Sequence, residues 1–581
     1  MYLEEVVIRN FCSCEHVELN LARFNPIIGY NNCGKSNILK AVSWLLRKSV
    51  LPLHTFHDAT IPVTVEGVIS EVNLNLLPAN QQASLAPFLD GQKLRFRRRQ
   101  DSPSVPATQV RVEVFNSANG QWQANPVGLD AAIGVLFPDP LYIEAMDDAA
   151  DDVSKFAAKN TIGLLLKLAI DQVRANNAAA LAQIEADLNV IGAHFNGANR
   201  LPELATLEQD GTAAIANFFP GLSLHLDILP PALEDLIKGA TISLSDVGGH
   251  RRPFTSFGHG AQRAVQMALI KLLAGLLSAA NPEGATTVLL IDEPELYLHP
   301  QAIETLRDSL KLLSNQNFQI IFSTHSPLFL GEDVLNTGMI FKDANGKTGV
   351  RQKLATAAAT IAQNPHQASV IFSIQNATYL LFSEHVTLVE GKTEMMLVPD
   401  LCRIVRGESL AQQKACIVEA QSSSSISPMM QVLRAVGFSP KAVVDLDYVF
   451  KVAPAAGFVD ALSQDFVACK GWFANNGGVL GFYLGDDGCP TKRTAANEFS
   501  AVRPEAAFAL MAAANVDAVA RLCDHMQTQG IWVWRRGAVE AHLGIAKNDG
   551  ARMGFLQALK ANGNADHAAH ADDVGAFVAW L

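Results

Sequence analysis

The sequence predicts an α/β protein with two units of chemistry in series: a nucleotide-binding domain interrupted by a helical insertion, and a second α/β domain after it. A Gly-rich loop joins an apolar stretch to a helix at residues 29–36. Two apolar strands flank a helix between residues 287 and 326, an alternation typical of a parallel sheet covered by helices. A further group of Val-rich strands, which end in carboxylates, begins near Val386.

The loop at residues 29–36 reads Gly-Tyr-Asn-Asn-Cys-Gly-Lys-Ser, which is the spacing of a phosphate-binding loop. Apolar residues precede it, and apolar side chains at helical spacing follow from residue 37. The backbone N–H groups of such a turn point at phosphate oxygens. The alternative is a Gly-containing turn with an incidental lysine. We expect a nucleotide, ATP or GTP, with Mg²⁺ here, Lys35 reaching the β/γ-phosphates, Ser36 holding the metal, and Asn32 and Gly34 in the cradle. The ATPase motifs described below favour ATP.

Composition limits the class of protein. The chain has 581 residues, enough for two to four domains, with 49% hydrophobic and 18% charged residues. The eight cysteines are scattered and offer no zinc-ligand pairs, so we expect reduced thiols. The N-terminus lacks the features of a signal peptide, and the most apolar run, 265–280, is interrupted by Lys271. We therefore expect a cytoplasmic protein with no membrane contact.

The formal charge of −12 argues against a protein that coats nucleic acid electrostatically. It leaves room for a nucleic-acid enzyme whose acidic residues hold metal. The one dense basic run, residues 95–99, is interpreted as a solvated edge strand in preference to a nucleic-acid contact. Extended segments on either side of it, with Asn119-Gly120 as a turn, predict an antiparallel β subdomain between residues 61 and 142.

Residues 149–190 are rich in Ala, Leu and charged residues at helical spacing, which predicts a helical insertion. It would pack on the parent domain or on a second subunit, and we favour a dimer contact. The chain becomes extended again from Leu222, and the next helix is expected near Gln262. The predicted division is therefore 1–147 and 221–380 for the nucleotide-binding domain, 148–220 for the insertion and 381–581 for the last domain.

Two buried strands end in side chains suited to ATP hydrolysis. Residues 288–293 form an apolar strand that ends in Asp292 and Glu293. Asp292 would act on Mg²⁺ through water, and Glu293 would polarise the attacking water. Residues 320–325 end in His325, which would sit near the γ-phosphate. A structural histidine at a strand end is the alternative.

The order of these motifs, with the segment 256–263 between them, resembles ABC-type ATPases of the structural-maintenance-of-chromosomes and DNA-repair class. The resemblance implies a head-to-tail dimer in which the signature segment of one subunit completes the nucleotide site of the other. Gly258, Gly260 and Gln262 are the matching positions here. The sequence departs from the pattern at His259, where transporters have the signature serine.

The last domain carries a second set of carboxylates. A strand runs into Glu390-Gly391, and a helix bearing Glu394 follows. Another strand ends in Asp445 and Asp447, which alternation along a strand would put on one face. Carboxylates at neighbouring strand ends form a hard-oxygen site suited to Mg²⁺ or Mn²⁺. The pattern resembles the Toprim domain of topoisomerases, primases and certain nucleases, which implies metal-dependent phosphodiester chemistry.

Residues 531–543 are again a strand, a glycine and a helix with an acid. They resemble the later Gly-x-x-Glu element of nuclease-type Toprim domains, which implies that Glu540 is a metal ligand and Arg536 a phosphate contact. The alternative for Glu540 is a solvated acid that favours the helix dipole. We expect a flexible loop at 421–428 and a turn at 486–488.

An ABC-type ATPase followed by a Toprim domain resembles the overcoming-lysogenization-defect (OLD) family and the nuclease subunit of Gabija-type antiphage systems. The resemblance implies a nucleotide-regulated, metal-dependent DNA endonuclease or nickase in phage defence or DNA processing, with DNA and a homodimer or higher oligomer as partners. A second defence protein is a further partner it allows. The competing hypothesis is an ATP-driven sensor or scaffold whose Toprim domain only binds a partner effector.

Overall fold

The structure is a computed structural model, and it describes residues 1–124, 128–138, 140–144, 178–196, 200–216, 218–228, 242–245, 248–280, 285–330, 337–353, 356, 380–492 and 499–581. The prediction of helix between residues 149 and 177 lies outside the described residues.

An antiparallel six-stranded sheet opens the chain, with the spatial order β2-β1-β4-β5-β6-β7. Its alternating side chains bury one face, as in strand β5, where every second residue is buried. The antiparallel subdomain is confirmed. The strands are β1 (Tyr2–Phe11), β2 (Cys14–Asn20), β4 (Val63–Ser70), β5 (Leu94–Gln100), β6 (Arg111–Asn116) and β7 (Gln121–Ala124).

The basic run is not an edge strand, because β5 is hydrogen-bonded to β4 on one side and to β6 on the other. Acids on both neighbouring strands and on a helix compensate the arginines. Arg95 pairs with Glu66 at 3.0 Å, Arg97 pairs with Glu113, and the fully buried Arg98 reaches Asp130 at 2.9 Å. The charge pattern suggested exposure only because these partners lie far away in sequence.

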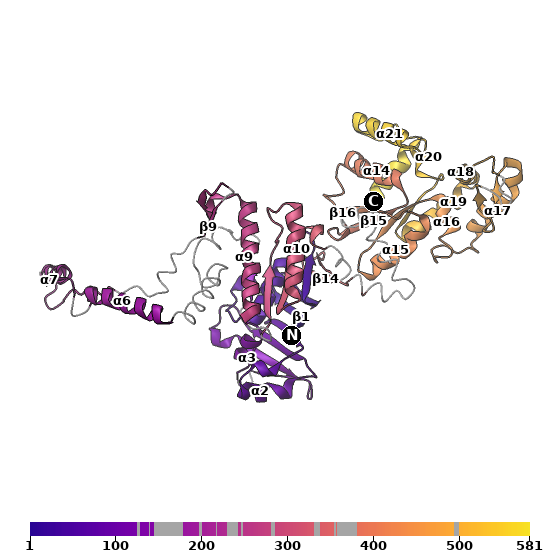
Figure 1. Cartoon of the computed structure of the whole chain (residues 1–581). Helices are drawn as coiled ribbons and strands as arrows, with labels where there is room; N and C mark the ends of the chain where they lie inside the picture. Colours follow the sequence, from indigo (N-terminus) through magenta and orange to yellow (C-terminus); the bar gives the residue numbers. More distant parts are fainter. Residues whose placement is uncertain are drawn as a thin grey trace.

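The second sheet, β14-β13-β3-β12-β11-β8, is parallel except for β14. Helix α1 contacts strands of both sheets and so lies between them, while α9 and α10 lie side by side on the parallel sheet (Figure 1). Helix α9 begins three residues before Gln262, the expected start. The elements are α1 (Lys35–Leu46), β3 (Phe24–Ile28), β8 (Leu141–Ile143), α9 (His259–Ala280), β11 (Thr287–Ile291), α10 (Pro300–Ser314), β12 (Phe318–Thr324), β13 (Gly338–Lys342) and β14 (Thr348–Arg351).

Smaller elements complete this half of the chain. Helices α2 (Ala79–Leu85) and α3 (Leu129–Leu136) belong to the antiparallel lobe. The described part of the insertion is helical, in α6 (Ala178–Asn196) and α7 (Pro202–Ala216), and a two-stranded ribbon, β9 (Ser243–Ser245) with β10 (Arg251–Pro253), precedes α9. Short 3-10 turns occupy Leu53–Thr55, Leu74–Leu76, Ala86–Phe88, Ala107–Gln109, Phe254–Ser256 and Pro327–Phe329.

The C-terminal domain is built on a parallel sheet with the order β16-β15-β17-β20. Residues 423–428, expected to be loop, form the first turns of a helix, α15, because Ile426, Met429 and Met430 bury an apolar face. The Ser-rich composition concealed that period. The elements are β15 (His385–Val389), α14 (Lys392–Leu401) with a π-turn at Cys402–Arg406, β16 (Ala415–Glu419), α15 (Ser423–Ala435), β17 (Lys441–Asp445), α16 (Leu446–Lys451), β20 (Ile531–Trp534), α20 (Val539–Leu543), α21 (Asp549–Asn562) and α22 (Ala571–Trp580).

A subdomain is inserted between α16 and β20. It consists of helices α17 (Gln464–Leu480), α18 (Pro504–Ala514) and α19 (Val516–Thr528) and a small hairpin, β18 (Tyr483–Leu484) with β19 (Pro490–Thr491). The expected turn at residues 486–488 is the tip of this hairpin. Sequence patterns did not separate the subdomain from the rest of the domain.

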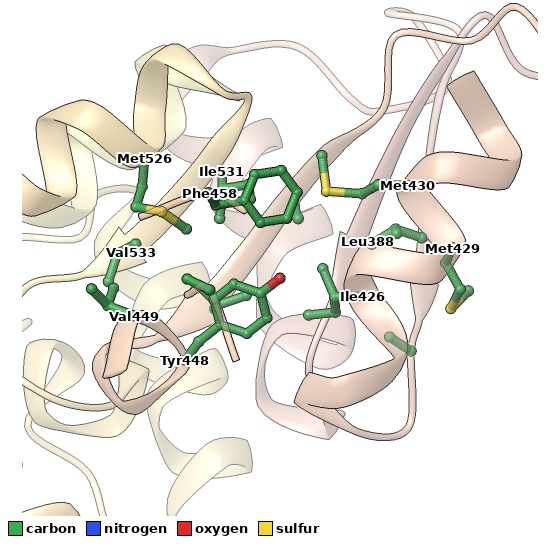
Figure 2. Packing of buried hydrophobic residues seen from close by; sticks show 14 of the residues in the cluster. Leu388, Ile426, Met429, Met430, Tyr448, Val449, Phe458, Met526, Ile531 and Val533 are labelled. Carbon is green, nitrogen blue, oxygen red and sulfur yellow. The ribbon is translucent and has the colours of Figure 1, made fainter. Parts of the chain in front are cut away.

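Successive residues of the C-terminal sheet face two different cores, as expected for a parallel sheet covered on both sides. Leu388, Ile531 and Val533 enter the core under α15 to α19, which Figure 2 shows around Tyr448. Val389 and Trp532 enter the other core, under α14 and α20 to α22. The sheet is therefore buried on both faces, and its parallel register places the C-terminal ends of β15, β17 and β20 at one edge.

Among the described residues, no single helix is long and apolar enough to cross a membrane. The pair α18 and α19 meets the length and composition requirement jointly, but it is bent by 107°. Its apolar residues, among them Phe508, Met511 and Leu522, are buried in the domain core.

Candidate functional site

The phosphate loop is built as its spacing predicts, since it leaves the end of β3 and opens α1 at Lys35. Gly34 has φ +109°, a conformation that L side chains rarely adopt, and an added Cβ would collide with Thr348. The Nζ of Lys35 donates to the carbonyls of Gly29 and Tyr30, both at 3.1 Å. An anion in the loop would offer this buried ammonium stronger acceptors than two carbonyls.

The acids predicted at the end of β11 lie beside this loop. The hydroxyl of Ser323 on β12 donates to Oδ1 of Asp292 and accepts from the backbone N of Glu293 at 3.0 Å. Glu293, just after β11, has φ +48°, a costly conformation for a residue with a side chain. Burial raises the pKa of Glu293, Asp292 adds to the rise and Lys35 opposes it. A base of raised pKa is suited to taking a proton from water.

His325 contacts both groups, with Nε2 2.8 Å from Nζ of Lys35 and 3.3 Å from Oε1 of Glu293. Burial lowers the pKa of His325 to about 4, and the Lys35 ammonium adds to this, so the imidazole is neutral at neutral pH. Glu295, which the sequence analysis did not assign, accepts from the backbone N of His325 at 2.6 Å and from Thr324 at 2.9 Å. The sequence feature that could have identified Glu295 is its position two residues after Glu293.

The signature-like segment, residues 256–263, is held mainly by its own contacts, and at its end Arg263 donates to the carbonyl of Asp292 at 3.4 Å. Gln262 is buried and donates to the carbonyl of Phe257 at 2.8 Å, so it holds its own segment in place. A Cβ at Gly260 would meet the carbonyl of Tyr297, whereas one at Gly258 would meet nothing within 4 Å. Gly258 thus lies on an open surface. The His259 ring packs against the Tyr297 ring at a tilt of 32°, with 5.2 Å between centroids.

The C-terminal sheet brings Glu390, Asp445 and Asp447 together at one pocket. Glu390 follows β15, and its Oε2 accepts from the backbone N of Asp445 at 3.4 Å. The prediction that Asp445 and Asp447 share a strand face is wrong, because β17 ends at Asp445 and Asp447 lies in the first turn of α16. The helical turn nevertheless returns Asp447 to the same pocket, where Lys451 pairs with it at 3.0 Å.

These carboxylates disfavour one another's charge. Burial raises the pKa of Asp445 well above its usual range, and Glu394 and Glu390 add to the rise. Burial likewise raises the pKa of Glu394 to about 8, with further contributions from Glu540 and Glu390. A site of this kind is stabilised by a cation placed among the carboxylates.

Lys547 supplies one such cation, and the sequence analysis missed it. Burial opposes its charge, but Asp445, Glu540, Glu394 and Glu390 together raise the pKa of Lys547 above its ordinary value. It follows α20 in a loop and carries no motif that marks it in sequence.

Glu540 is buried, which contradicts the alternative of a solvated first-turn acid. Its Oε1 accepts from the hydroxyl of Thr393 at 2.6 Å, and Arg552 lies 3.7 Å away. Within the described residues its Oε2 is a buried oxygen with no hydrogen-bond partner. Arg536 points elsewhere, since its Nε donates to Asp573 at 3.0 Å and it does not line the pocket.

The pocket is a cavity of about 510 Å³ with five acids and three lysines in its lining. The oxygen donors in this lining and the excess of acids over lysines fit hard divalent cations. Glu540 does not line the cavity, but the unpartnered oxygen of this buried acid is a further oxygen donor beside Thr393. As the side chains stand, no three His, Cys, Asp or Glu residues of the described chain are grouped closely enough to hold an ion. Lys451 pairs with Oδ2 of Asp447, which leaves Oδ1 as the oxygen outside that pair.

Comparison with known families divides the chain in the same way. A model described as an AAA ATPase domain matches residues 1–176, and an AAA domain model matches residues 138–331. The model for the Toprim domain of overcoming-lysogenization-defect-like proteins matches residues 381–447, which hold Glu390, Glu394, Asp445 and Asp447.

Among curated proteins, the Old nuclease of Escherichia phage P2 is 32% identical over 570 residues, which is 94% of this chain and 93% of the relative. The chain belongs to the OLD nuclease family. Endonuclease GajA of Bacillus cereus strain VD045 is a second relative, 23% identical over 68% of this chain and 67% of that protein. A solved SMC head bound to the C-terminal winged-helix domain of ScpA is 16% identical, covers 62% of this chain and all of its own, and has a TM-score of 0.39.

This OLD-family chain thus joins an N-terminal ATPase domain to a C-terminal Toprim domain, the classes of domain that use nucleotide and divalent metal. The ATPase domain and the Toprim domain are in direct contact. The Lys414 ammonium lies 4.1 Å from the ring centroid of Tyr30, a residue of the phosphate loop, and pairs with Glu384 at 2.8 Å. Arg351 of the ATPase domain donates to the carbonyl of Gly437 and lies over Phe438.

Proposed function

We propose that this protein binds and hydrolyses ATP and is a metal-dependent DNA endonuclease or nickase that acts in antiphage defence or DNA processing. The observation that carries the proposal is the pocket where Glu390, Asp445 and Asp447 meet Lys547, in the same chain as the phosphate loop. The names of its relatives, Old nuclease and endonuclease GajA, support DNA cleavage as the reaction.

In the ATPase domain, we assign nucleotide and Mg²⁺ binding to Asn32, Gly34, Lys35, Ser36 and Asp292. Glu293 would accept a proton from the attacking water, and the neutral His325, held by Glu295, would orient it. The domain would comprise residues 1–147 and 221–380, with the insertion at 148–220.

In the Toprim domain, residues 381–581, we assign Mg²⁺ or Mn²⁺ to Glu390, Glu394, Asp445, Asp447 and Glu540. Divalent ions at such a site supply an activated water and neutralise the leaving oxygen of a phosphodiester. The protein's own contribution is to hold the carboxylate oxygens at the strand ends. Lys547 would balance their charge before metal enters.

The test is a plasmid assay. Purified protein is incubated with supercoiled DNA and Mg²⁺ or Mn²⁺, with and without ATP, and the expected products are nicked or linear molecules. Calcium, which accepts looser coordination, should support DNA binding better than cleavage. DNA that stays supercoiled under every metal and nucleotide condition would contradict the proposal.

A second candidate function is an ATP-driven sensor or scaffold whose Toprim domain binds a partner effector, such as a second defence protein, without cutting DNA. The pairing of Asp447 with Lys451, and the lack of a preformed group of metal-holding side chains among the described residues, favour it. The same plasmid assay separates the two, because only the nuclease cuts DNA by itself.

We also propose that ATP joins two copies head to tail. The supporting feature is the open surface around Gly258. In a head-to-tail dimer this surface would contact the nucleotide that is bound in the phosphate loop of the second subunit. Light scattering of the Glu293→Gln protein with ATP is expected to give at least a dimer. The Lys35→Ala protein with ATP is the control and should resemble the nucleotide-free state. A strictly monomeric Glu293→Gln protein at micromolar concentration would rule the sandwich out.

A further inference from the structure

The pocket at the Toprim carboxylates has a second wall that the Toprim sheet does not build. The inserted subdomain supplies it, through hairpin β18–β19 and the start of α18. Thr491, Lys492 and Phe508 line the cavity from this side, opposite Glu390 and Asp445. Anything long that reaches the carboxylates therefore also meets this hairpin.

The three lysines of the pocket are in different situations. Lys451 pairs with Asp447 at 3.0 Å and lies over the ring of Phe508. Lys547 faces the carboxylates that raise its pKa. Lys492 is exposed, and within the described residues its ammonium makes no ion pair or hydrogen bond. It is the lysine of this cavity that is available to an anion from outside.

The backbone at Lys492 is hydrogen-bonded to Ser500. Its carbonyl accepts from the backbone N of Ser500 at 3.2 Å, and the Ser500 hydroxyl donates to the Thr491 carbonyl at 2.7 Å. At the other end of the hairpin, Cys489 is buried, donates from its backbone N to Asp487 at 2.9 Å and contacts the Lys470 ammonium. These hydrogen bonds hold the backbone of the hairpin in place, which suits it to carry a side chain that positions a ligand.

We propose that Lys492 binds a backbone phosphate of the DNA next to the phosphodiester being cut. Hairpin β18–β19 is then the wall of the Toprim pocket that contacts the DNA substrate. This inference rests on the proposed nuclease function and adds a substrate contact outside the carboxylate site. Lys492 is a positioning residue, since it acts on the flank of the substrate and not on the reacting atoms.

The experiment compares the full-length parental protein with Lys492→Gln and Lys492→Arg, using a labelled DNA duplex. Lys560→Gln is the matched control, because Lys560 pairs with Asp400 on α14 and does not line the pocket. Binding is measured with Ca²⁺ at several salt concentrations, and cleavage kinetics are measured with Mg²⁺ or Mn²⁺.

Lys492→Gln is expected to weaken binding about fivefold, and to reduce the slope of log affinity against log salt by about 0.9, the value of one lost phosphate contact. KM should rise by the same factor while kcat stays at the parental value, Lys492→Arg should restore both constants, and Lys560→Gln should change neither. Parental affinity and slope in Lys492→Gln, or a fall in kcat alone, overturn the inference while the parental protein still cuts DNA. If the parental protein neither binds nor cuts DNA, the result contradicts the proposed nuclease function itself, and with it the role of Lys492.

Discussion

Replacing Asp445 by Asn is expected to abolish DNA cleavage while ATP hydrolysis continues at the parental rate. Asp445 lies where β17 ends, and burial raises its pKa well above the usual range, with Glu394 and Glu390 adding to the rise. The amide can still accept from the backbone N of Val539, as Oδ1 of Asp445 does at 3.1 Å, so the local fold is preserved. It no longer provides the charge that a divalent cation needs. Loss of one metal ligand should lower the cleavage rate by at least about 100-fold.

Asp486→Asn is the matched control for this variant. It makes the same chemical change in the same domain, at an exposed turn residue outside the pocket lining, and should cut DNA at the parental rate. Plasmid nicking and phosphate release are measured on the same preparations. Cleavage that survives in Asp445→Asn while Asp486→Asn behaves as parental would remove Asp445 from the metal site and favour the sensor hypothesis.

A thermal melt gives the same variant a second readout. Without metal, Asp445→Asn should melt at or above the parental temperature, because one of several mutually repelling carboxylates has been neutralised. Mn²⁺ should stabilise the parental protein by about 2.7 kcal/mol at a hundredfold excess over its Kd, and stabilise the variant less. Equal stabilisation of both proteins would mean that the ion binds elsewhere.

Both candidate sites could be located from the sequence because each consists of local strand-end motifs. The Gly-rich loop between β3 and α1 and the acidic pair after β11 are recognised from residues that are adjacent in the sequence, so no knowledge of tertiary contacts is needed. Glu295 and Lys547 were missed because what singles them out depends on the fold. Glu295 accepts a hydrogen bond from the backbone N of His325, and the charges of four carboxylates raise the pKa of Lys547. Long-range pairing was equally invisible for Arg98, whose partner Asp130 lies on a helix.

Predictions failed where a short pattern supported two geometries. Asp445 and Asp447 are two residues apart, a spacing that fits one face of a strand, yet α16 begins between them. The serines at 422–425 resemble a loop, but they open α15 because the apolar residues that follow are buried in the sheet's core. In both cases tertiary packing decided between local conformations of similar cost.

Lys35→Ala is expected to lower ATP hydrolysis by about 10²- to 10³-fold, because it removes the one buried ammonium at the mouth of the phosphate loop. Its contacts with the Gly29 and Tyr30 carbonyls indicate where the cation rests before phosphate replaces those acceptors. Lys40→Ala, an exposed lysine on the same helix, is the control and should hydrolyse ATP normally. Phosphate release and nucleotide binding are measured together, since Lys35→Ala should lose both.

Glu293→Gln should separate the two properties that Lys35→Ala loses together. The amide is close in size to the carboxylate, and the backbone contact with Ser323 does not involve the side chain, so the strand end and the bound nucleotide should be retained. What is lost is the proton acceptor whose pKa burial and Asp292 raise. We therefore expect stable ATP binding with turnover reduced by at least about 100-fold. Hydrolysis at the parental rate would transfer the role of base to another group, with His325, which contacts Glu293 at 3.3 Å, the next to be replaced.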